Sequence, residues 1–84
     1  MREFKLLKNI RVYDVGGLEF EATSGTDIED AVEDAIKYLA MNNREGFYTL
    51  KFNNVKLQVN AFSIVHRVVE EYFDAVNNTQ GANI

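Results

Sequence analysis

The sequence predicts an α+β domain in which the elements follow the order strand, strand, helix, strand, strand, helix. Two observations lead to this fold class. Short alternating runs of apolar and polar residues meet at turn-forming residues, and each pair of runs precedes a longer stretch with apolar residues at helical spacing. We therefore expect ββαββα topology, with a four-stranded, mostly antiparallel sheet, two helices packed on one face and a polar opposite face.

The first pair of strands is expected over residues 10–22, around Gly16-Gly17. A two-residue loop would set Asp14 opposite Glu19 and would expose half of the apolar residues. A three-residue loop ending on a glycine bulge instead groups them on one face: Ile10, Val12, Leu18, Phe20 and Ala22. We favour the three-residue loop, which also places Arg11 across from Glu21. Phe4 and Leu6 have the parity of Ile10, which indicates a long first strand with a break near Lys8-Asn9.

A helix is expected after this hairpin, from a capping box at Thr26 and Glu29 to the Asn42-Asn43 pair. Its apolar residues form one stripe: Ile28, Ala31, Val32, Ala35, Ile36 and Leu39. Such a stripe is typical of a helix that packs one side on a sheet.

The second pair of strands is expected over residues 48–59, with Asn53-Asn54 at the turn. Asparagine tolerates the positive φ that both central residues of a type I′ turn require. This register pairs Phe52 with Val55 and puts the apolar residues of both strands on one side. A second helix follows over residues 61–78, and its apolar arc covers about half of the circumference, which is wider than packing on one sheet needs.

Length and composition indicate one domain. Eighty-four residues with 46% apolar content support one core and not two. We assign residues 1–76 to this domain, in two similar ββα halves of about 1–43 and 44–78, and residues 77–84 to a flexible tail. The chain has no cysteine, which suits a reducing compartment, and it has no apolar run long enough to span a membrane. A cytoplasmic location is expected.

Residue types that carry chemistry are sparse. His66 is the only histidine, and Glu70 four residues later is its local neighbour, so neither a metal site nor a catalytic triad is indicated. The glycines match no phosphate-binding loop. We expect no enzymatic activity, no metal and no cofactor.

Charge is distributed unevenly along the chain. The formal net charge is −4, and residues 25–46, where six acids accompany Lys37 and Arg44, hold the whole imbalance. Acids in the first turn of a helix interact favourably with the helix dipole, and Glu33 has Lys37 four residues later. Asp34 has no comparable reason, because Asp30 repels it from one turn back. Helical projection places the acidic side of this helix and its far end on one surface, which is either a solvated helix face or a partner-binding site: Asp27, Asp30, Glu33, Asp34 and Met41.

Two other surfaces are candidates. The wide apolar arc of the second helix is either the centre of the core or, at its margin with Ile64 and Val68, a contact with a second copy in a homodimer. A possible ligand face is expected on the open side of the sheet, from Arg11, Tyr13, Lys51 and Lys56. Direct nucleic-acid binding is not expected, because four such residues do not make the basic field that binding to phosphates requires.

The leading hypothesis from the sequence is a small non-enzymatic protein-interaction module. It would bind a basic, nucleic-acid-handling protein through its acidic first helix, as an inhibitor or regulator from a phage or mobile element. The alternatives are a structural or assembly protein that acts as a homo-oligomer through the second helix, and a small-ligand binder that uses the open sheet face.

Overall fold

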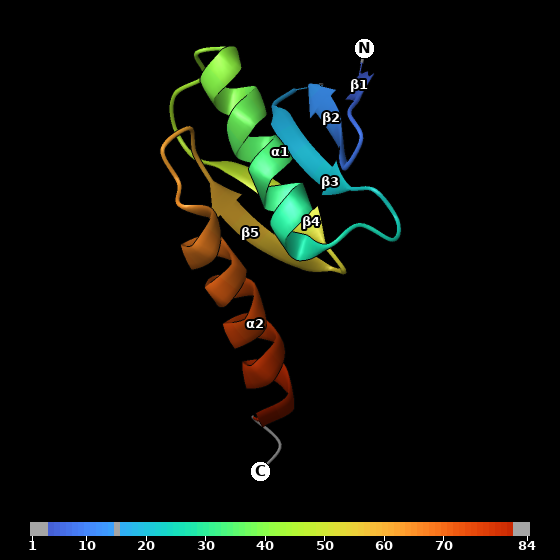
Figure 1. Cartoon of the computed structure of the whole chain (residues 1–84), viewed down its shortest axis with the longest axis vertical. Helices are drawn as coiled ribbons and strands as arrows, with labels where there is room; N and C mark the ends of the chain where they lie inside the picture. The colour runs from blue at the N-terminus through green and yellow to red at the C-terminus, as the bar shows by residue number, and fades with distance from the viewer. Residues whose placement is uncertain (1–3, 15, 82–84) are drawn as a thin grey trace.

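In the computed structural model, which describes residues 4–14 and 16–81, one sheet carries both helices (Figure 1). The elements are β1 (Phe4–Leu6), β2 (Ile10–Asp14), β3 (Leu18–Ala22), α1 (Ile28–Met41), β4 (Tyr48–Phe52), β5 (Val55–Val59) and α2 (Val65–Gly81). The sheet order is β1-β2-β3-β4-β5. Its neighbouring strands are antiparallel except β3 and β4, which are parallel and are connected through α1. The predicted α+β class and ββαββα order are confirmed, with the four expected strands as β2 to β5 and the short β1 added at the edge.

The β2–β3 hairpin has the register of the three-residue loop. Asp14 pairs with Leu18 and Arg11 pairs with Glu21 across the strands, as favoured from the sequence. The alternating burial of Ile10, Val12 and the inward residues of β3 follows from this register. Residue 15, in the loop, lies outside the described residues.

The β4–β5 hairpin is also confirmed. Phe52 pairs with Val55, and Asn53 and Asn54 have φ angles of 48° and 68°. Both values lie in the left-handed region that the expected turn requires.

Strand β1 corrects the expectation of one long first strand. The break at Lys8-Asn9 is present, but the chain reverses there, and the Leu7 N–H donates a 2.9 Å hydrogen bond to the Ile10 carbonyl. Strand β1 therefore runs back along β2, with Phe4 beside Tyr13. An apolar side chain at every second residue is expected on both sides of the break whether the strand continues or the chain turns back. The pattern alone therefore does not distinguish the two cases.

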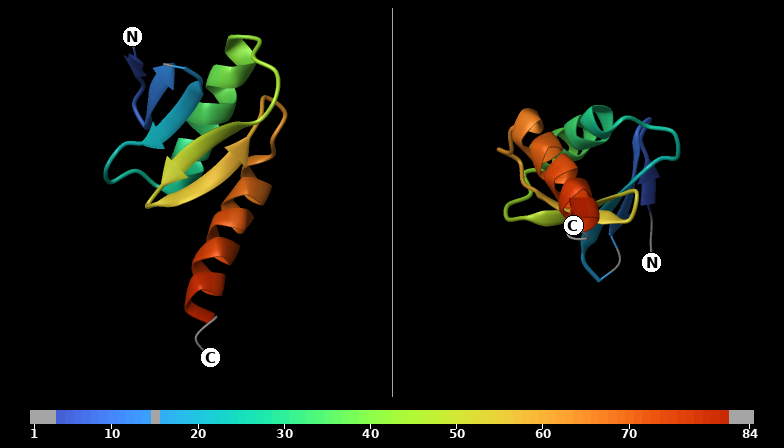
Figure 2. Two further views of the ribbon diagram at one scale, coloured as in Figure 1. Left: turned by 180° about the vertical axis from the view of Figure 1, so that it is seen from behind. Right: turned by 90° about the horizontal axis from the view of Figure 1, so that it is seen from below.

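The core fills the space between one face of the sheet and the two helices, which lie on the same side of it (Figure 2). Its buried residues come from β2 to β5, from α1 and from one position of α2: Ile10, Val12, Leu18, Phe20, Ala31, Val32, Ala35, Leu39, Leu50, Phe52, Leu57, Val59 and Val68. The opposite face of the sheet has no covering element among the described residues.

Helix α1 begins one position later than the sequence suggests. Asp27 is the N-cap residue, its carbonyl accepts the first helical hydrogen bond from Ala31, and no side chain caps the helix. The capping box predicted from Thr26 and Glu29 is therefore wrong, because neither residue has the position that the motif requires. At the other end Asn43 has a φ of 53°, and the Arg44 N–H donates to the Leu39 carbonyl, which closes the helix in a Schellman arrangement.

Helix α2 packs on the body of the protein along its first half. Its Tyr72 ring meets Phe52 edge to face at 5.0 Å between centroids. Beyond this contact the helix projects past the sheet, which gives the molecule its 44 Å long axis (Figure 1). The helix continues to Gly81, so the first residues of the tail predicted at 77–84 are helical, and residues 82–84 lie outside the described residues.

Candidate interaction surfaces

The N-terminal half of α1 presents an acidic strip, defined here as the exposed carboxylates of Asp27, Glu29, Asp30 and Glu33. Three of them were assigned to a binding surface from the sequence, and Glu29 is added by its exposure. Within the described residues, the side chains that form ion pairs are Arg44 with Asp14 and His66 with Glu70. The expected pair between Glu33 and Lys37 is not formed. The strip therefore carries its negative charge without an ionic partner in the described chain.

Asp34 does not belong to the strip. Its side chain is half-buried, and its Oδ2 accepts a 3.2 Å hydrogen bond from the backbone N–H of Asn9. This bond fastens the β1–β2 turn to α1. Asp34 thus has a structural role in the fold, and its part in a partner-binding surface stays a prediction.

Met41 lies at the far end of α1 and is 76% exposed. It borders a shallow hollow of about 350 Å³ whose lining is Leu7, Lys8, Asp34, Lys37, Tyr38, Met41 and Asn42. The neighbours of Met41 therefore include two lysines. The surroundings of Met41 thus differ in charge from the acidic strip, although the sequence predicted Met41 on the same surface.

The four residues of the possible ligand face do not converge on one site. Arg11 and Lys51 line a depression of about 390 Å³ in which Glu21 lies with them, because Glu21 pairs with Arg11 on one side and Lys51 on the other. Lys56 pairs with Lys51 across the strands, and it lines neither this depression nor the hollow beside Tyr13. The Glu21 carboxylate lies between Arg11 and Lys51 and offsets their positive charge, so this depression makes a poor anion site.

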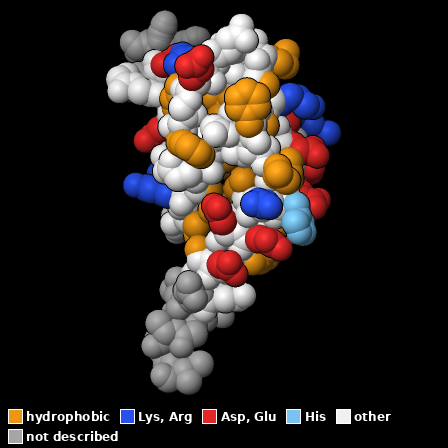
Figure 3. Space-filling view, turned by 90° about the vertical axis from the view of Figure 1, so that its left-hand side faces the viewer, with side chains coloured by type: hydrophobic (Ala, Val, Ile, Leu, Met, Phe, Trp, Pro, Cys, Tyr) orange, Lys and Arg blue, Asp and Glu red, His pale blue; other side chains and the backbone are white. Residues whose placement is uncertain are grey.

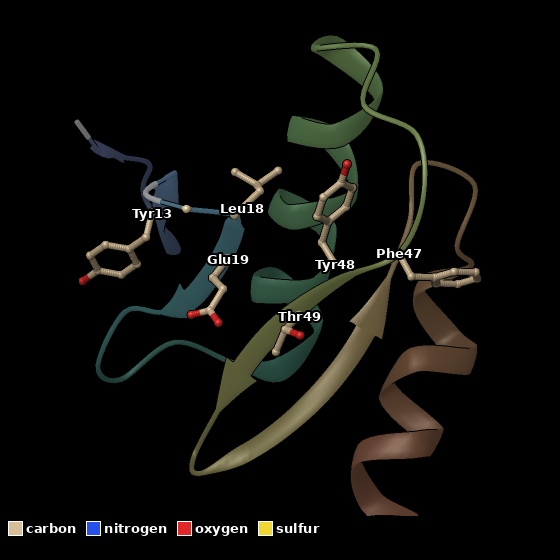
Figure 4. Close-up of a pocket in the computed structure, with 8 residues that line it drawn as sticks. Tyr13, Leu18, Glu19, Phe47, Tyr48 and Thr49 are labelled. Carbon is tan, nitrogen blue, oxygen red and sulfur yellow. The ribbon is translucent and has the colours of Figure 1, made fainter. Parts of the chain in front are cut away.

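Tyr13 lines a different hollow, of about 420 Å³, at the other end of the open face (Figure 4). Its lining also includes Glu19, Phe47, Tyr48 and Thr49, with the Phe47 ring at the margin nearest α2 in the view of Figure 4. The hollow is open and polar, and it holds no cluster of groups suited to acid–base or nucleophilic chemistry.

An ion pair joins the end of β2 to the segment between α1 and β4. Arg44 Nη2 lies 2.8 Å from Asp14 Oδ2. Hydrogen bonding with the Tyr48 side chain, with a further contribution from the charge of Asp14, raises the pKa of Arg44 against the opposing effect of desolvation. Tyr48 itself donates a 2.7 Å hydrogen bond to the Glu45 carbonyl. These polar groups hold the connection in place.

His66 has the environment expected from the sequence. Its Nε2 lies 3.3 Å from Glu70 Oε2, and both side chains are mostly exposed. No group of three histidine, cysteine, aspartate or glutamate side chains suited to a metal ion occurs in the part of the chain that the structure describes.

Large apolar side chains reach the surface at the turn before α2 and along α2 itself. Phe62 is 90% exposed, Ile64 is 58% exposed and Phe73 is about half exposed. Figure 3 shows a face on which hydrophobic side chains emerge between charged ones. Val68, assigned with Ile64 to self-association, is only 4% exposed and belongs to the core. It faces the molecule's own sheet and α1, so it does not offer a surface to a second copy.

Comparisons with protein-family models, with curated proteins and with solved structures find no match for this chain. Within residues 4–14 and 16–81, none of the helices combines the length and apolar character needed to cross a membrane.

Proposed function

We propose that this protein is a non-enzymatic interaction module that binds a basic surface of another protein through the acidic strip of α1. The observation that supports it most directly is the exposure of Asp27, Glu29, Asp30 and Glu33 together with their lack of ionic partners among the described residues. The helix dipole accounts for acids in the first turn only, and Glu33 lies beyond it.

Binding of a basic partner would offset the electrostatic repulsion between the carboxylates of the strip. Carboxylates one turn apart on a helix repel each other by about 0.2–0.5 kcal/mol per pair. Positive side chains brought by a partner replace this repulsion with attraction, and the negative field of the strip accelerates the encounter.

The chemistry of the strip also favours one class of partner. A row of carboxylates on a rigid helix offers negative charges to groups that otherwise bind phosphates, and such groups form the basic surfaces of nucleic-acid-handling proteins. Occupying that surface would exclude nucleic acid. The proposed role is accordingly that of a small inhibitor or regulator, of the kind that a phage or mobile element encodes.

The test is a pull-down from a host lysate with the wild type and an Asp30→Lys, Glu33→Lys double variant. Asp34 stays unchanged, because its hydrogen bond to Asn9 supports the fold. We expect a stoichiometric partner on the wild type, at least about tenfold less on the variant, and release of that partner by added double-stranded DNA.

A matched control carries the same change of charge elsewhere. Glu71→Lys, Asp74→Lys alters two exposed acids of α2 that form no ion pair among the described residues, and this variant should retain the partner. Equal retention by the strip variant, or equal loss with the control, would contradict the proposal, since net charge and not the strip would then govern binding.

A further inference from the structure

The turn between β5 and α2 is held rigidly by its own side chains. The backbone N–H of Asn60 donates to Ser63 Oγ at 2.8 Å, and Asn60 Oδ1 accepts from the Phe62 N–H at 2.9 Å and from Ser63 Oγ at 3.1 Å. The Ser63 N–H also donates to the Asn60 carbonyl at 3.1 Å. The backbone of Phe62 is thus fixed while its ring lies almost wholly in water.

A rigidly held, exposed aromatic residue is well suited to bind an apolar pocket. The turn has already lost most of its backbone freedom, so burying the ring would cost little further ordering. Aromatic residues of this kind commonly anchor protein interfaces. Nothing in the described chain covers Phe62, and it contributes little to the core.

A hollow lies directly beside the ring. Its volume is about 350 Å³, and besides Phe62 its lining is Leu39, Ala40, Asn43, Arg44, Glu45 and Ala61. The end of α1 and the following connection form one wall, and the turn forms the other. A projecting side chain and an adjacent recess therefore share one surface.

Such a surface is complementary to itself. In a two-fold arrangement the same patch of both copies meets, so each Phe62 can enter the hollow of the other copy, and both contacts form at once. A partner of another sequence would need its own matching recess and projection in the same spacing.

Charge also favours a second copy at this surface. The acidic strip lies toward the N-terminal end of α1, and two copies that met there would bring like charges together. The charged residues that line the hollow, Arg44 and Glu45, are of opposite sign, and Arg44 also pairs with Asp14. A net negative chain can approach its own copy here without accumulating negative charge.

We propose that the protein forms a symmetric dimer in which Phe62 of each copy occupies the hollow between α1 and the β5–α2 turn of the other. Ile64, exposed two residues later, would lie at the margin of this interface. The inference does not depend on the proposed function of the acidic strip.

The test is sedimentation velocity of the full chain over a dilution series, with the wild type, Phe62→Ser and Ala40→Arg. Phe62→Ser removes the projection, and Ala40→Arg fills the recess from an exposed position. We expect a wild-type dimer and at least a tenfold weaker association of each variant. Unchanged thermal melting at low concentration would show that both variants still fold.

Mixing the two variants gives a sharper result. A pair with one Phe62→Ser chain and one Ala40→Arg chain retains one intact projection and one unfilled recess, which lacks only the Phe62 part of its lining, so the mixture should associate more tightly than either variant alone. Phe73→Ser, which changes an exposed phenylalanine on the projecting part of α2, should leave the dimer intact.

Three outcomes would overturn the inference. They are a wild type that stays monomeric at the highest concentration, association that Phe62→Ser leaves unchanged, and loss of the dimer with Phe73→Ser in place of Phe62→Ser. The last result would place the interface on α2.

Discussion

Asp34 shows how one side chain can look functional in the sequence and be structural in the fold. It has a like charge one turn back and is a weak helix former, so nothing within α1 explains it. The explanation lies 25 residues away, where the Asn9 N–H would lack this acceptor if Asp34 were removed. The exposed acids of the strip make no such contact among the described residues.

This difference predicts unequal effects of two neighbouring substitutions. Asp34→Ala should lower the free energy of unfolding by about 1 kcal/mol, because a partly buried N–H loses a charged acceptor. Glu33→Ala should change it by less than about 0.5 kcal/mol, as is usual for an exposed residue. Urea denaturation of the two variants measures both values, and equal effects would show that the hydrogen bond to Asn9 contributes no more than the Asp30 repulsion and the low helix propensity that Asp34→Ala removes.

At the scale of elements, the turns set the registers on which the core depends. The β4–β5 turn requires two residues with positive φ, and asparagine meets this demand less well than glycine but better than other residues. A turn that could not adopt these angles would disturb the pairing of Phe52 with Val55.

Two substitutions of Asn54 test this requirement. Asn54→Gly should keep or slightly raise the free energy of unfolding, whereas Asn54→Ala should lower it by about 1 kcal/mol, because a Cβ disfavours the left-handed conformation. Thermal or chemical denaturation distinguishes them. A less stable glycine variant would mean that the side chain of Asn54, and not its backbone angle, stabilises the turn.

For the whole molecule, the main asymmetry is between a packed body and a projecting helix end. Helix α1 lies over the sheet along its length and buries four residues, whereas α2 leaves the body after Tyr72 (Figure 1). A helix end that lies past the sheet gains less stability from packing, and a short helix is only marginally stable in water by itself.

Hydrogen exchange should report this asymmetry. Amides of residues 31–39 are expected to exchange only through global unfolding, and amides beyond residue 73 through local fraying that is faster by orders of magnitude. Mass spectrometry of peptides from the two helices measures the difference. Equal protection of the end of α2 would indicate that a second molecule covers it.

The sequence was sufficient for the fold class and for both hairpin registers, because alternation and turn residues encode them locally. It was insufficient where a contact joins distant segments. The reversal at Lys8-Asn9, the role of Asp34 and the burial of Val68 all depend on tertiary packing, which a helical projection does not contain. Periodicity alone places Phe62 in the apolar arc of the second helix, whereas its position before the first helical turn, near Asn60 and Ser63, distinguishes it from that arc.

The parallel pairing of β3 with β4 has a consequence for the order in which the chain folds. Each hairpin can form from neighbouring residues, but this pairing, with Phe20 beside Leu50, must close a segment that contains all of α1. Such non-local closure is slow compared with hairpin formation. The rate-limiting step of folding is therefore expected to be the docking of two preformed hairpins around α1. Neither half, severed near Asn43, should fold without the other.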